Sequence, residues 1–251
     1  MTITNSEKLK KYLELNREKI SVIVDFNKKK DQLTEFDFTS KNKDLNSETM
    51  AETNRFSAWI NRELDKNKAL YGIGGYNEHR TIYARSKLFD TTEEPRRLHL
   101  GIDIWGAAGT RVYAPLEGKV HSFKFNDNFG DYGATIILEH DLDGLIVQSL
   151  YGHLNLASLA DLKVGQLIPQ GKYFTQFGIP AENGHWPPHL HFQLIFNMGY
   201  FKGDYPGVCR YSQKEMFLQN CPNPMLVLNT TFNDTRFNDN PVKIAAETLN
   251  F

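Results

Sequence analysis

The sequence predicts a mainly β protein, in which an antiparallel β domain follows an N-terminal α/β cap and precedes a short C-terminal extension. From residue 71 onward, short runs rich in β-branched and aromatic residues alternate with glycine-containing turns, which is typical of antiparallel sheets. Before that point, two helical patterns flank two short apolar runs, and after residue 200 the strand pattern weakens. We therefore place the domain boundaries at 1–68, 69–205 and 206–251.

The cap is predicted from its hydrophobic spacing. Residues 5–18 and 48–64 carry apolar side chains at helical spacing, and residues 21–26 and 33–38 between them indicate strands or extended segments. The apolar face of the second helix consists of Phe56, Trp59, Ile60 and Leu64. Burying each such side chain is worth about 1.5 to 3 kcal/mol, so we expect this face to pack against the β domain.

Turn and cap signals place the remaining elements. Residues 109–120 predict a hairpin, and residues 135–140 and 145–151 predict two antiparallel strands joined by an Asp-Gly turn. In the extension, Ser212 followed by Glu215 matches a capping box and predicts one short helix.

Composition excludes several function classes. Of 251 residues, 40% are hydrophobic and 24% are charged, which is typical of a globular protein. The formal net charge of −1 argues against a general nucleic-acid binder, which needs a basic surface. No segment approaches the roughly 20 apolar residues of a membrane span. Cys209 and Cys221 match neither a redox motif nor a zinc ribbon, and we expect buried or free thiols.

The first twenty residues are charged and lack the apolar core of a signal peptide. The sequence therefore predicts a cytoplasmic protein, exported only if a leader was removed or a non-classical route exists.

Histidines concentrate in three short motifs. His189 and His191 lie two residues apart in a predicted strand, so they share a face with Cα atoms about 6.6 Å apart and both rings can reach one metal ion. Upstream lie His99-Leu100-Gly101-Ile102-Asp103 and the Tyr-Gly-His-Leu motif of His153. In an extended strand His99 and Asp103 are about 13 Å apart, so the backbone must bend at Gly101. Two imidazoles and a carboxylate leave one position of a tetrahedral zinc open, as in catalytic sites.

The order His-x-x-x-Asp, Tyr-x-His-Leu and Pro-His-x-His-Phe resembles the lysostaphin-type zinc metalloendopeptidases, many of which cut peptide cross-links of peptidoglycan. The likeness covers roughly residues 71–200 and implies an antiparallel β-sheet hydrolase domain. It implies zinc held by His99, Asp103 and His191, with His153 and His189 as catalytic residues near the metal-bound water. The implied partner is a peptide or peptidoglycan-fragment substrate.

Two alternatives remain. The same scaffold serves as a non-catalytic zinc-containing binding module, or as a hydrolase of an intracellular substrate. A pseudo-enzyme typically loses one ligand or the base, whereas all five residues are present here.

Other residues are weaker candidates. Four histidines have no partner at ligand spacing and are interpreted as surface or packing residues: His79, His121, His140 and His185. The last of these, with Trp186 and Tyr132, is also a candidate for the rim of the cleft. The family's active-site tyrosine corresponds to Tyr76 or Tyr83. Some family members are latent because an asparagine occupies the open zinc position, and Asn77 is either such a latch or a plain turn residue.

Overall fold

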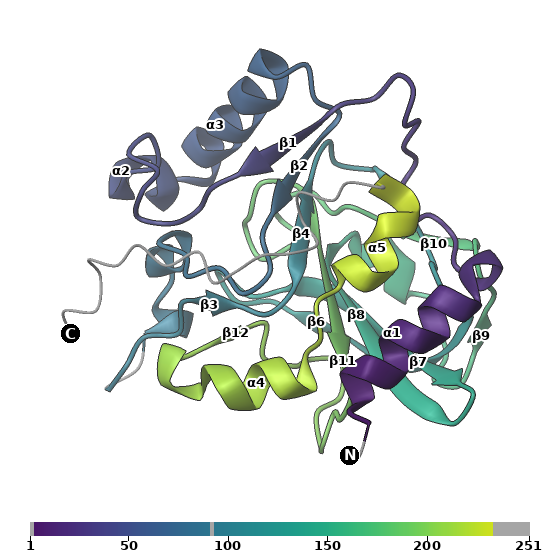
Figure 1. Cartoon of the computed structure of the whole chain (residues 1–251). Coiled ribbons are helices and arrows are strands. Elements are labelled where there is room, and N and C mark those ends of the chain that lie inside the picture. Colours follow the sequence, from purple (N-terminus) through teal and green to yellow (C-terminus); the bar gives the residue numbers. More distant parts are fainter. Residues whose placement is uncertain (1–2, 91–92, 233–251) are drawn as a thin grey trace.

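The computed structural model describes residues 3–90 and 93–232, and a mixed sheet of eight strands forms its centre (Figure 1). The strand order is β1-β2-β4-β11-β8-β7-β6-β9. The strands are β1 (Leu33–Phe36), β2 (Tyr71–Gly74), β3 (Leu98–His99), β4 (Ile102–Trp105), β5 (Arg111–Tyr113), β6 (Gly118–Asn126), β7 (Gly133–Leu142), β8 (Leu145–Leu154), β9 (Leu167–Ile168), β10 (Tyr173–Gln176), β11 (His189–Ile195) and β12 (Val208–Cys209). The helices are α1 (Asn5–Leu15), α2 (Ser47–Ala51), α3 (Thr53–Lys66), α4 (Lys214–Asn220) and α5 (Met225–Phe232).

The mainly β prediction is confirmed, and most neighbouring strands of the sheet pair antiparallel. Strands β7 and β8 form the longest ladder, in which Leu142 pairs with Leu145 across the predicted turn. Asp143 and Gly144 both have positive φ, as a two-residue hairpin turn requires. The exception is β1, which pairs parallel with β2.

The predicted hairpin over residues 109–120 is wrong. Strand β5 pairs with β10 in a separate two-stranded sheet, whereas β6 pairs with β7 and β9. The backbone of Ala114 explains the difference, because it pairs outside the segment: its N–H donates to Lys172 O and its carbonyl oxygen accepts from Gly171 N–H. Pro115 cannot donate a backbone hydrogen bond, which also opposes a continuous hairpin.

The N-terminal segment packs against the central sheet near Trp105 of β4. The predicted helix over 48–64 is two helices, α2 and α3, which meet at Glu52. As expected, the four apolar residues of the second helix are buried; they join Phe38, Trp105 and Trp186 in one hydrophobic cluster. Residues 21–26 contain no strand. Because β1 is a strand of the central sheet, the N-terminal segment contributes to the same sheet as β4 and β11. The domain boundary at residue 68 stays a prediction.

The extension covers another part of the sheet with helices α4 and α5. The predicted helix is present, but Ser212 does not cap it: its hydroxyl contacts Glu94, and Gln213 is the N-cap residue. Helix α5 joins α1 in the main core cluster, and the remainder of the extension, residues 233–251, lies outside the described residues. Cys209 and Cys221 are free and buried, as predicted. No helix among residues 3–90 and 93–232 is long and apolar enough to cross a membrane.

Candidate metal and catalytic site

Three side chains of metal-ligand type lie together where β3, β4 and β11 meet. Sheet register sets Asp103 of β4 opposite His191 of β11, and His99 ends β3. His99 Nε2 lies 3.0 Å from His191 Nδ1. Asp103 Oδ1 lies 3.3 Å from the first of these nitrogens and 3.1 Å from the second. All three residues are buried, and their ligand atoms lie within 4.8 Å of one another. We call these three residues the ligand cluster.

Gly101 allows His191 to reach this cluster. Strand β3 ends at His99 and β4 begins at Ile102, which confirms the bend expected at Gly101. A Cβ atom on Gly101 would lie 2.6 Å from His191 Cε1 and 2.8 Å from the Phe192 carbonyl oxygen. Any larger residue would therefore displace the imidazole or the strand.

Hydrogen bonds on the outer side of each imidazole fix which nitrogen faces the cluster. His99 Nδ1 donates to the Gly75 carbonyl oxygen at 2.8 Å, which leaves the Nε2 lone pair pointing inward. His191 Nε2 donates to Gln193 Oε1 at 2.9 Å, which leaves Nδ1 as the inward acceptor. The orientation of the Gln193 amide is set by its own donation to Pro206 O. Two lone pairs and a carboxylate oxygen thus converge in a buried space.

Two charged residues that sequence analysis missed lie behind Asp103. Arg80 donates from Nη1 to Asp103 Oδ2 and from Nε to Glu78 Oε2 at 2.7 Å, and both partners are buried. Burial alone raises the pKa of Asp103, but His99 and the Arg80 guanidinium hold that pKa well below its usual range. Asp103 is therefore an anion at neutral pH. No local motif marks Arg80, because its contact depends on the pairing of β2 with β4.

His153 and His189 form a second group, which we call the histidine pair. Their ring centroids lie 4.1 Å apart, and the centroid of His153 lies 6.3 Å from that of His191. The Trp105 ring stacks on His189 with centroids 3.8 Å apart and planes at 12°. His153 is the next-to-last residue of the long strand β8 and has a φ of 63°.

Both members of the pair are neutral proton acceptors. His153 Nδ1 donates to Asn183 O at 2.8 Å and His189 Nδ1 donates to Pro187 O at 2.7 Å, so Nε2 is the acceptor in each ring. Burial lowers the pKa of His189 to about 4. Burial, with the neighbouring His189, lowers the pKa of His153 well below its ordinary value.

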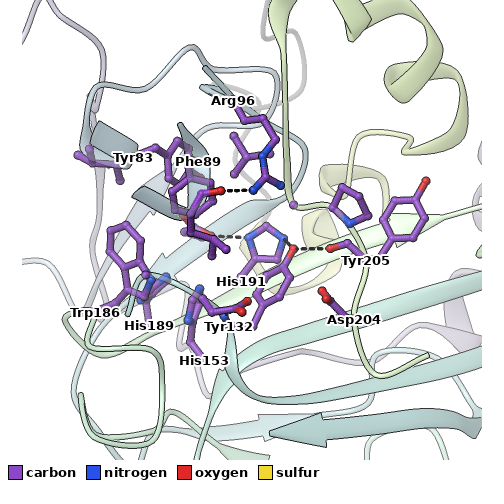
Figure 2. A pocket seen from close by; sticks show the side chains of 18 of the residues that line it. Tyr83, Phe89, Arg96, Tyr132, His153, Trp186, His189, His191, Asp204 and Tyr205 are labelled. Atoms are coloured by element: carbon purple, nitrogen blue, oxygen red, sulfur yellow. Dashed lines mark hydrogen bonds and ion pairs between the residues drawn. The ribbon is translucent and has the colours of Figure 1, made fainter. Parts of the chain in front are cut away.

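A pocket of about 270 Å³ lies over both groups. Figure 2 shows His191 at its centre, with Trp186, His189 and His153 on one side and Tyr205 with Asp204 on the other. Tyr132 and Trp186, both cleft candidates from the sequence, line this pocket. The Tyr132 hydroxyl donates to Tyr205 O at 3.1 Å and lies 3.5 Å from His191 Nε2.

The weaker candidates separate clearly. Tyr83 lines the pocket, whereas the hydroxyl of Tyr76 donates to Cys221 O. Asn77 is absent from the pocket lining; it has a φ of 55° and its backbone N–H donates to His99 O, which supports a turn role over a latch. His185 is exposed and stacks on Phe129.

The other three histidines lie outside the pocket lining as well. His140 is buried between Glu117 O at 2.7 Å and Ser149 Oγ at 2.6 Å. His121 contacts Ser122 Oγ, and His79 pairs in an isolated bridge with Leu98.

Residues 97–202 match the model of peptidase family M23. This interval, which is less than half of the chain, therefore resembles an M23 peptidase domain. All five residues of the ligand cluster and the histidine pair lie inside the matched interval, whereas Glu78 and Arg80 lie outside it. The matched family is a family of peptidases.

Two solved structures resemble parts of this chain. A zinc-containing peptidase from Vibrio cholerae is 27% identical over 39% of this chain and 27% of its own, with a TM-score of 0.31. The catalytic domain of the antimicrobial peptidase lysostaphin from Staphylococcus simulans is 22% identical over 64% of this chain and 96% of its own, with a TM-score of 0.38. No curated protein matches the chain.

Proposed function

We propose that the chain is a zinc-dependent endopeptidase of peptidoglycan-type or glycyl peptides. The observation that carries the proposal is the inward convergence of His99 Nε2, His191 Nδ1 and Asp103 Oδ1 in a buried cluster beside two neutral imidazoles. Such a convergence of acceptors is repulsive unless a cation lies between them.

The donor set and its spacing fit zinc. Two imidazole nitrogens and one carboxylate oxygen are typical of catalytic zinc sites, which keep a fourth position for water or substrate. Tetrahedral ligands with bonds of about 2.0 to 2.1 Å lie about 3.3 Å from one another. The three observed separations, 3.0, 3.1 and 3.3 Å, are close to that value. His99, Asp103 and His191 are therefore the residues that would hold the ion.

The remaining chemistry belongs to the histidine pair. Zinc, when bound, lowers the pKa of a water molecule and polarises a carbonyl group. His153 and His189 each present an unprotonated Nε2 at the pocket, so either ring can accept a proton from the attacking water and return it to the leaving amine. A ring that has accepted the proton also stabilises negative charge on the tetrahedral intermediate.

The substrate class rests on the motif resemblance and the family. Peptidoglycan lies outside the cytosol, so this substrate implies export of the chain, whereas an intracellular peptide is the alternative substrate. The pocket is lined by aromatic side chains such as Tyr83 and by polar groups such as Asp204, a mixture that suits a peptide of either origin.

The test combines elemental analysis with hydrolysis by the purified full chain. Zinc is measured per chain, and cleavage of a glycyl peptide and of soluble peptidoglycan fragments is followed by mass spectrometry. The matched control is His121→Ala, which removes an imidazole outside the pocket lining. We expect one zinc per chain and cleavage of at least one substrate by both proteins. Zinc without cleavage of either substrate would favour the non-catalytic binding module, and absence of bound metal would overturn the proposal.

A further inference from the structure

Arg80 is the most completely engaged charged side chain next to the ligand cluster. It is fully buried and forms four contacts: with Glu78 Oε2, Asp103 Oδ2, the Tyr83 hydroxyl at 3.3 Å and the Gly75 carbonyl oxygen at 3.0 Å. A planar guanidinium can make several directed hydrogen bonds at once, which a lysine ammonium cannot match. The side chain therefore has one orientation.

Through these contacts Arg80 is connected to Asp103 directly and to His99 through a shared acceptor, on the sides that face away from the ligand cluster. Arg80 binds the carboxylate oxygen of Asp103 that faces away from His99 and His191, so Oδ1 remains directed inward. The Gly75 carbonyl oxygen, which accepts from Arg80 Nη2, also accepts from His99 Nδ1. One guanidinium thus links the outer hydrogen bonds of both Asp103 and His99.

The surrounding chain is shaped to hold this guanidinium. A Cβ atom on Gly74 would lie 2.7 Å from Arg80 Nη2, so glycine leaves the room that Arg80 occupies. The Phe38 ring, which comes from the N-terminal segment, lies 5.0 Å from the guanidinium carbon. The backbone N–H of Phe38 contacts Glu78 at 3.4 Å, and its carbonyl oxygen accepts from Thr81 N–H.

We propose that Arg80, held by Glu78, is a positioning residue that orients Asp103 and His99 for zinc binding. It does not line the pocket, so it acts on the site through the ligands and not through substrate. This inference rests on the proposed function. It also gives the N-terminal segment a role, because Phe38 and Glu78 lie outside the residues matched by the M23 model.

The test measures zinc affinity of the full chain, stripped of metal and titrated against a fluorescent chelator. The first variant is Arg80→Met with Glu78→Gln, which removes the guanidinium without leaving Glu78 as a buried carboxylate that has lost its ion pair. The second is Arg80→Lys, which keeps the charge but loses the fork. The control is Arg85→Met: Arg85 also lies among aromatic rings, 4.7 Å from the Trp186 centroid, but has no contact with Asp103. Thermal unfolding of each metal-free protein checks the fold.

Loss of an outer hydrogen bond to a metal ligand typically costs about 10- to 100-fold in metal affinity. We expect a loss in this range for the double variant and about tenfold for Arg80→Lys, with an altered visible spectrum when cobalt replaces zinc. Arg85→Met should keep the wild-type affinity and spectrum.

Wild-type zinc affinity in a folded double variant, or in Arg80→Lys if the double variant does not fold, would overturn the inference while leaving the proposed function intact. An equal loss in Arg85→Met would also overturn it, because the effect would then be a general loss of packing. Failure of the wild-type chain to bind zinc would instead remove the proposed function, and this inference with it.

Discussion

His189 and His191 lie two residues apart on β11, yet their surroundings differ in kind. His191 meets a carboxylate, a second imidazole and, one shell further out, the Arg80 guanidinium. His189 meets aromatic rings: Trp105 stacks on it, and Trp186 lies edge-on with centroids 6.4 Å apart. Strand β11 therefore places His191 in charged surroundings and His189 in apolar surroundings.

The difference shows how one site obtains two functions from one residue type. Fixed charges and outer hydrogen bonds keep the three inward atoms of the ligand cluster converged, as binding of a cation would require. Apolar walls exclude water and lower the pKa of His189 and His153, which keeps both rings neutral and able to accept a proton. The charged half of the site, around His191, and the apolar half, around His189, can therefore be disrupted separately.

The largest effect is expected from the charged half. Asp103→Ala or His191→Ala removes one of three protein ligands and should abolish stoichiometric zinc binding, at a cost of several kcal/mol in metal affinity. Elemental analysis of purified variants checks this result. Full zinc occupancy in both would refute the assignment of the ligand cluster.

In the apolar half, His153→Ala and His189→Ala should retain zinc but lose hydrolysis by about 100- to 10,000-fold, the usual cost of losing general acid–base catalysis. Rate and zinc content are measured on the same preparations. If His189→Ala empties the site while His191→Ala leaves it filled, the two roles are reversed.

Trp105 and Trp186, which we call the aromatic wall, lie beside His189. Disrupting the packing of this wall should have a smaller but still measurable effect on hydrolysis. Phe56 of α3 is fully buried against Trp105 and Trp186, with centroids 5.8 and 6.4 Å away. Phe56→Ala should lower the free energy of unfolding by about 3 to 5 kcal/mol. It should also lower the hydrolysis rate without changing zinc content, because the ring stacked on His189 loses its support.

Denaturant unfolding and kinetics of Phe56→Ala are compared with those of Leu9→Ala. Leu9 is equally buried but belongs to a different core cluster from that of Phe56, Trp105 and Trp186. Both variants should lose stability, and only Phe56→Ala should lose activity at temperatures where it is folded. Equal rates in the two variants would show that the wall does not support catalysis.

The smallest effect concerns a histidine outside both halves. Burial lowers the pKa of His140 to about 4, from 6.5 for an exposed histidine. Protons then bind preferentially to the unfolded chain between these values, so stability is present above pH 6.5 and is lost as the pH falls toward 4. The contribution of His140 should decrease by about 2 kcal/mol between pH 8 and pH 5.

This contribution is the difference in pH dependence between wild type and His140→Gln, measured by denaturant unfolding at both pH values. The other buried histidines add the same dependence to both proteins and cancel. Parallel curves for the two proteins would contradict the burial argument.

Local motifs explain why so much of the site could be predicted. His189 and His191 share a strand, and the Gly101 bend follows from the distance that an extended strand would impose between His99 and Asp103. The β7–β8 hairpin could also be predicted, because a two-residue turn fixes the pairing register of the two strands that it joins.

The rest depends on contacts between distant segments. Arg80 reaches Asp103 only because β2 pairs with β4, and the Trp105 wall exists only because α3 packs across it. Residues 109–120 were mispredicted for the same reason: the partner of Ala114 is the distant segment at Gly171. The turn residues next to a strand do not show which distant strand that strand pairs with.

The central claim is that a metal ion in the ligand cluster and a neutral histidine pair act together on peptides. The most direct test is to strip the full chain of metal with a chelator, measure hydrolysis of soluble peptidoglycan fragments and a glycyl peptide, and then titrate zinc. We predict that hydrolysis falls to the level of Asp103→Ala and returns in proportion to zinc, with saturation at one equivalent. Undiminished hydrolysis by the metal-free chain would contradict the account.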